Sequence, residues 1–121
     1  MKRTSDPLGP LTPMEFHVLL SLSERALHGY AILQDVAQRT RDQVTLRTGT
    51  LYTVIKRMLD SRWIEETRGP GDDERRRYYR LTPLGREVVR TEARRMQELV
   101  TLAQAKRVLA RPRKLAPERG R

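Results

Sequence analysis

The chain has 121 residues, enough for one small domain with a modest hydrophobic core. It contains no cysteine, which excludes disulfides, cysteine-based zinc sites and thiol catalysis, and two histidines without clustered acids predict no metal site. The net charge of +10 and the pI of about 11.0 favour a nucleic-acid partner, or less often an anionic membrane surface. Residues 106–121 alone carry +6 of this charge.

The first eleven residues are polar and contain Pro7, Gly9 and Pro10, which predicts a flexible arm over residues 1–11. No apolar segment follows Met1, and no apolar run is long enough to cross a bilayer. We therefore expect a cytoplasmic protein with no membrane association.

Two helices are predicted next. Thr12-Pro13-Met14-Glu15 has the pattern of a capping box with proline at the first helical position, and apolar residues continue to Leu22. A second helix is expected to begin near His28-Gly29-Tyr30 and to end in the polar turn around Arg39.

The stretch 48–59 predicts a third, amphipathic helix. Leu51, Ile55 and Met58 fall on one apolar stripe, and Leu59 extends it. The remaining surface carries hydroxyls and cations, which can bond base edges or phosphates in a DNA major groove. Taken alone, this helix fits an ordinary surface helix with a solvated polar face better. The candidate DNA contacts on it are Thr48, Thr50, Tyr52, Thr53, Lys56 and Arg57.

A β-hairpin is predicted to follow. A strand over 63–68 leads into the turn 69–73, and a strand over 74–81 returns with Tyr79 and Leu81 on one face. Three arginines beside the turn either contact DNA phosphates or form a solvated edge; these are Arg75, Arg76 and Arg77. The predicted fold class is mainly α with a small β-hairpin: a winged helix-turn-helix over residues 12–82, plus a long C-terminal dimerisation helix.

That last helix is expected over residues 83–109, because Thr82-Pro83 repeats the earlier helix opening. A heptad-like apolar stripe along it favours pairing with a second copy, the alternative being that the helix folds back on its own domain. The stripe consists of Val89, Ala93, Met96, Leu99, Val100 and Ala103. Residues 110–121 are basic and contain two prolines, which predicts a disordered tail.

Five short motifs occur in an order that resembles the PadR family of bacterial transcriptional regulators over about residues 11–90. They are Leu11–Phe16, Leu27–Tyr30, Gly49–Tyr52, Arg76–Thr82 and Gly85-Arg86. The resemblance implies a homodimeric winged-helix repressor that binds inverted-repeat operators in double-stranded DNA without a cofactor. Some members respond to phenolic acids or flat hydrophobic drugs. The last helix here has no aromatic residue, which argues against a pocket of that kind, and a small-molecule or protein effector stays unidentified.

Two other functions stay open at this point. The basic surface also fits a winged-helix module that grips an acidic protein, and the tail fits an RNA-binding protein without operator specificity. An enzyme is not expected, because the sequence shows no nucleophile–base pair and no glycine-rich phosphate loop after a strand.

Overall fold

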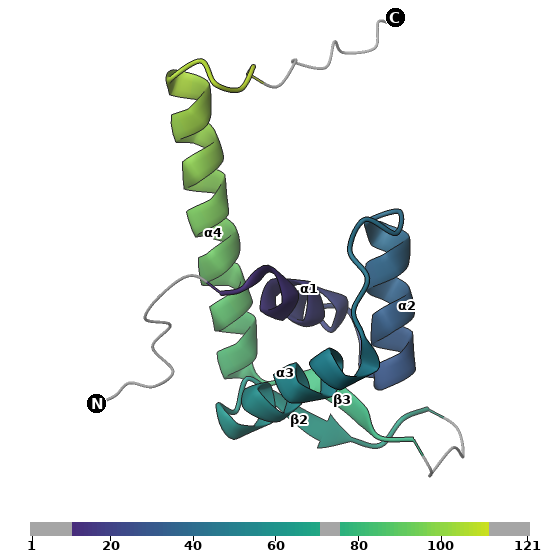
Figure 1. The fold of residues 1–121 in the computed structure, drawn as a ribbon. Coiled ribbons are helices and arrows are strands. Elements are labelled where there is room, and N and C mark those ends of the chain that lie inside the picture. Colours follow the sequence, from purple (N-terminus) through teal and green to yellow (C-terminus); the bar gives the residue numbers. More distant parts are fainter. Residues whose placement is uncertain (1–10, 71–75, 112–121) are drawn as a thin grey trace, which may run out of the picture.

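Four helices and three short strands make up the part of the chain that the computed structural model describes, residues 11–70 and 76–111 (Figure 1). The mainly helical winged-helix fold predicted from the sequence is confirmed. In chain order the elements are α1 (Pro13–Ser21), β1 (Leu27–His28), α2 (Gly29–Arg39), α3 (Thr48–Asp60), β2 (Ile64–Thr67), β3 (Tyr78–Leu81) and α4 (Pro83–Ala105).

Side chains cap the first two helices. The predicted capping box of α1 is present: Thr12 Oγ1 accepts from the Glu15 amide at 3.1 Å, and Glu15 Oε1 accepts from the Thr12 amide at 2.9 Å. At α2, His28 Nδ1 accepts from the Ala31 amide at 3.1 Å. Leu11 is buried in the core, so the predicted arm is one residue too long, and its other ten residues lie outside the described part.

The sheet has three strands where the sequence predicts two. β2 and β3 form the hairpin, and β1 pairs antiparallel with the other edge of β3, giving the order β1-β3-β2. A strand of two residues is too short to show an alternating pattern, so no pattern in the sequence indicates it. The pairing sets His28 opposite Tyr78 and thereby joins the start of α2 to the wing.

The core lies where α1, α2 and α3 meet the sheet. The third helix turns Leu51, Val54, Ile55 and Met58 inward, and Trp63 is buried beside them, as predicted. The helix ends without glycine: Arg62 itself adopts the left-handed conformation, with a φ of 64°.

The last helix packs on the body only along its first part. A Cβ at Gly85 would collide with the backbone carbonyl of Trp63, so glycine allows α4 to approach the wing closely. Val89 is buried with the core, which corrects its assignment to a dimer seam. The helix ends at Ala105, four residues before the predicted Leu109.

Beyond this contact, the upper turns of α4 extend past the other elements (Figure 1). Apolar side chains on these turns are exposed: Leu99 is 59% exposed and Leu102 is 51% exposed. Across residues 11–70 and 76–111, no helix combines the length and apolarity needed to span a bilayer.

Candidate nucleic-acid interface

All six candidate contacts on α3 are exposed, because the apolar residues of the helix pack against the core and leave the rest of its surface outside. They are Thr48, Thr50, Tyr52, Thr53, Lys56 and Arg57. The Thr53 hydroxyl donates to the Gly49 carbonyl at 3.0 Å and so keeps its lone pairs for an outside donor. Lys56 Nζ lies 3.4 Å from Asp60 Oδ2, and both side chains are exposed. A phosphate can therefore readily take the place of the carboxylate as the partner of Lys56.

Arg57, the sixth candidate on α3, has a different environment. Its Nη1 lies 2.6 Å from Oε2 of Glu15, whose side chain is only 7% exposed. A buried carboxylate needs a partner of opposite charge, and Arg57 supplies it across 42 positions of sequence. Arg57 therefore ties α3 to α1, a structural role that the sequence analysis did not assign.

The wing contributes two described arginines. Arg76 and Arg77 are exposed just before β3, whereas Arg75 lies outside the described residues. Arg77 Nη1 is 3.6 Å from Glu66, in a pair exposed on both sides. Arg76 Nη1 lies 2.6 Å from Nε2 of His28.

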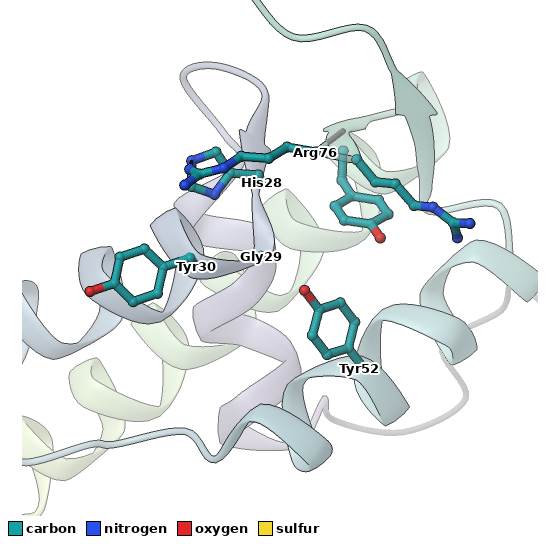
Figure 2. Close-up of a pocket in the computed structure, with 7 residues that line it drawn as sticks. His28, Gly29, Tyr30, Tyr52 and Arg76 are labelled. Carbon is teal, nitrogen blue, oxygen red and sulfur yellow. Dashed lines mark hydrogen bonds between the residues drawn. The ribbon is translucent and has the colours of Figure 1, made fainter. Parts of the chain in front are cut away.

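An open groove of about 480 Å³ joins the wing to the first turns of α2 and α3 (Figure 2). Three segments far apart in sequence line it with hydroxyl, imidazole and guanidinium groups, and its described lining contains no carboxylate. A groove of this composition favours an anion with several oxygen acceptors, such as a phosphodiester. The lining residues are His28, Gly29, Tyr30, Tyr52, Arg76, Arg77 and Tyr79.

Tyr52 is placed in this groove by Gly29. Figure 2 shows its phenol rising from α3 toward the start of α2. A Cβ at Gly29 would collide with the Tyr52 hydroxyl oxygen, so only glycine leaves room for the ring in this position. Tyr52 is 46% exposed, so part of its side chain can be reached by a ligand.

Tyr79, which is buried, also lines this groove. Burial, reinforced by the nearby Glu66 carboxylate, raises the pKa of Tyr79. The phenol therefore remains a neutral hydrogen-bonding group to higher pH than an ordinary tyrosine does.

Sequence reasoning missed several groove residues. His28, Gly29 and Tyr30 belong to a motif quoted for the family resemblance, but nothing in their spacing showed that β1 would bring them beside the wing. Outside the groove, Arg47 is a further exposed cation at the N-cap of α3, where no side chain caps the helix.

Comparison with known protein families shows the family to which this chain belongs. Residues 18–91, more than half of the chain, match the transcriptional regulator PadR-like family. The chain belongs to the PadR-like family. It is therefore a transcriptional regulator of a winged-helix, DNA-binding class.

Solved structures agree with the fold of this PadR-like regulator. A PadR family transcription regulator from Clostridium difficile has a TM-score of 0.66 at 21% identity, covering 78% of this chain and 97% of that one. A PadR family regulator from Eggerthella lenta has a TM-score of 0.61 at 23% identity, covering 81% and 83%.

A protein of Lysinibacillus sphaericus, described as uncharacterized, is 34% identical over 70 residues. The match covers 57% of this chain and 64% of the relative, so this PadR-like chain matches less than two thirds of that protein's length.

Proposed function

We propose that this PadR-like regulator binds double-stranded DNA as a homodimer and represses genes from inverted-repeat operators in the cytoplasm. In this proposal the first turns of α3 enter the major groove, and the wing arginines contact flanking phosphates. The observation that carries it is the single exposed surface formed by Tyr52, Lys56 and the arginine-lined groove beside them. Repression follows when such a site overlaps a promoter, because the bound dimer occupies the DNA that polymerase needs.

The homodimer is supported by the end of α4 that the body leaves uncovered. Leu99, Val100 and Leu102 are 59%, 45% and 51% exposed, an apolar patch unusual for a monomer. A second copy of α4 at a shallow crossing angle would cover this patch and supply the heptad-like contacts. With Val89 in the core of its own domain, the proposed seam consists of Ala93, Met96, Leu99, Val100 and Ala103.

The dimer geometry explains why the operator should be symmetric. Two-fold symmetry repeats each recognition helix, and half-sites on one face of the duplex are separated by one turn, about 34 Å. The 23 residues of α4 span about 35 Å, at 1.5 Å per residue, so the helix is long enough to hold two DNA-binding domains apart. An effector, whether a small molecule or a protein, would act by changing the crossing angle of the two α4 helices.

The test combines selection with a measurement of mass. Selection from random duplexes should enrich an inverted repeat whose half-site centres are about 10 base pairs apart. Sedimentation equilibrium at micromolar concentration should give the mass of a dimer. A monomeric protein, or enrichment of single asymmetric sites, would contradict the dimer and the symmetric operator.

A further inference from the structure

The carboxylate of Glu15 uses its two oxygens to join the start of α1 to the second half of α3. Oε1 accepts from the Thr12 amide at 2.9 Å in the capping box, and Oε2 accepts from Arg57 Nη1 at 2.6 Å. The Glu15 side chain is only 7% exposed. A buried carboxylate with both oxygens engaged cannot change its rotamer without losing a hydrogen bond. Glu15 is therefore a fixed point against which α3 is held.

This ion pair joins two helices whose main neighbours differ. α3 packs mainly against α2 and β2, whereas α1 packs mainly against α2 and α4 (Figure 1). Apolar side chains hold α3 on the core, and the charged hydrogen bond adds a directional contact between α3 and α1. A directional contact resists rotation of a helix about its own axis, which apolar packing resists less.

Rotation of α3 matters because Arg57 and Lys56 are neighbours on it. Successive residues of a helix point about 100° apart, so an Arg57 fixed on α1 also fixes the direction in which Lys56 points. The hydroxyls on the exposed face of α3 turn with Lys56. The pair with Glu15 thus sets how the whole candidate DNA surface of the helix is presented.

The charge of Arg57 is already matched within the protein. The Arg57 side chain is 56% exposed, so exposure alone would allow a contact with DNA. At 2.6 Å from a carboxylate, however, its positive charge is largely cancelled at the distance of a DNA phosphate. Lys56 differs, because its partner Asp60 is exposed and easily replaced.

From these contacts we propose that Arg57 and Glu15 are positioning residues, which fix α3 so that the two recognition helices of a dimer fit both half-sites at once. α1 packs on α4, the proposed dimerisation helix, so the ion pair belongs to the connection between the α4 seam and each recognition helix. Binding to an operator depends on the spacing and tilt of the two helices, whereas non-specific binding depends on backbone charge. The proposal rests on the proposed function and assigns Arg57 a role other than DNA contact.

Two substitutions remove the ion pair from opposite ends. Glu15→Gln keeps the capping box, because glutamine also serves at this position, but its amide nitrogen then faces the guanidinium as a second donor. Arg57→Gln leaves the buried carboxylate without its partner. Each should lower the preference for operator over scrambled duplex about tenfold, within the range that one base contact contributes to discrimination. Glu15 is buried and touches no DNA, so a loss in Glu15→Gln can only act through the position of α3.

The double variant Glu15→Gln with Arg57→Gln separates positioning from stability. It has the net charge of the wild type and leaves no buried charge unpaired, so it should be more stable than Arg57→Gln. Its preference should nevertheless stay below that of the wild type, because two neutral amides hold the helices less firmly than a charged hydrogen bond. Arg57→Lys, which retains the charge, should keep more of the preference than Arg57→Gln.

Fluorescence anisotropy measures the preference. The probes are the inverted repeat obtained by selection and a scrambled duplex of the same length and composition. Circular dichroism gives the thermal stability of each variant and a temperature at which it is folded. If Arg57→Gln does not fold, Glu15→Gln and the double variant carry the same test. Titrations at several salt concentrations should give the wild-type slope for Arg57→Gln, whereas Lys56→Gln should reduce the slope by about one unit on both duplexes.

Three results would overturn the proposal and leave the proposed function standing. A salt slope reduced by about one unit in Arg57→Gln would make Arg57 a phosphate contact. Wild-type preference in Glu15→Gln would show that the pair does not position α3. A preference that follows thermal stability across all four variants would show that the pair only stabilises the fold. A wild-type protein that binds both duplexes equally would instead contradict the proposed function itself.

Discussion

The helices α3 and α4 are both amphipathic, but the rest of the domain covers the apolar face of α3 much more completely than that of α4. The residues that α3 buries are Leu51, Val54, Ile55 and Met58, and its exposed face is mainly polar and cationic. In α4 the buried positions end at Glu92, and apolar side chains such as Leu99 are exposed after that point. The first pattern favours a polar, charged ligand, and the second favours another apolar surface.

Substitutions at the exposed end of α4 should have the largest effect on dimerisation and on DNA affinity. In a dimer, Met96→Glu with Leu99→Glu would place carboxylates next to the same carboxylates of the second copy. These like charges would be buried away from water, which is costly. We expect a folded monomer whose operator affinity falls about a hundredfold or more, because linked half-sites gain about 10²–10⁴ in avidity. Sedimentation equilibrium and anisotropy measure the two effects.

The matched control adds the same charge to the opposite face of α4. Thr101→Glu with Ala105→Glu changes two exposed residues that lie away from the stripe. This variant should remain a dimer with at most a modest loss of affinity. Equal dissociation of both double variants would show that charge on α4, rather than the seam, controls assembly.

The next largest effect on DNA affinity is expected from a substitution where α2 meets α3. Gly29→Ala places a methyl group against the Tyr52 hydroxyl and should displace the ring from the groove. We expect a loss of DNA affinity of about tenfold, comparable to that of Tyr52→Ala, from a lost hydrogen bond to phosphate. If the two losses multiply in the double variant, Gly29 does not act through Tyr52.

Adjacent cations on α3 should respond differently to the same substitution. Arg57→Gln removes the partner of Glu15 and should lower the free energy of unfolding by about 1–2 kcal/mol, less than for a fully buried pair because Arg57 is half exposed. Lys56→Gln should leave stability unchanged and flatten the salt slope by about one unit. Urea unfolding and salt titration of both variants test this contrast, and the reverse pattern would contradict it.

The smallest effect on sequence preference is expected from the basic end of the chain. Deleting residues 110–121 removes a net charge of +4. Affinity for operator and for random duplex should fall by similar factors, because backbone charge contacts carry no sequence information. Competition between the two duplexes measures the ratio, and a loss confined to the operator would show that this segment reads sequence.

The sequence by itself determined the features that depend on neighbours along the chain. The capping box at Thr12, the proline that opens α4 at Pro83 and the inward face of α3 are set by residues three or four positions apart. The alternation that buries Tyr79 and Leu81 is equally local. Such patterns can be recognised because helix and strand periods place nearby residues on a common face.

Only the tertiary structure decided which distant residues meet. The two-residue β1, the ion pair between Glu15 and Arg57, and the approach of His28 to Arg76 join positions 42 to 52 residues apart. The burial of Val89 also depends on how far the body reaches along α4. None of these contacts produces a periodic pattern in the sequence, because each depends on how whole elements pack. The pairing of Arg57, predicted as a DNA contact, with the buried carboxylate of Glu15 is one result of that packing.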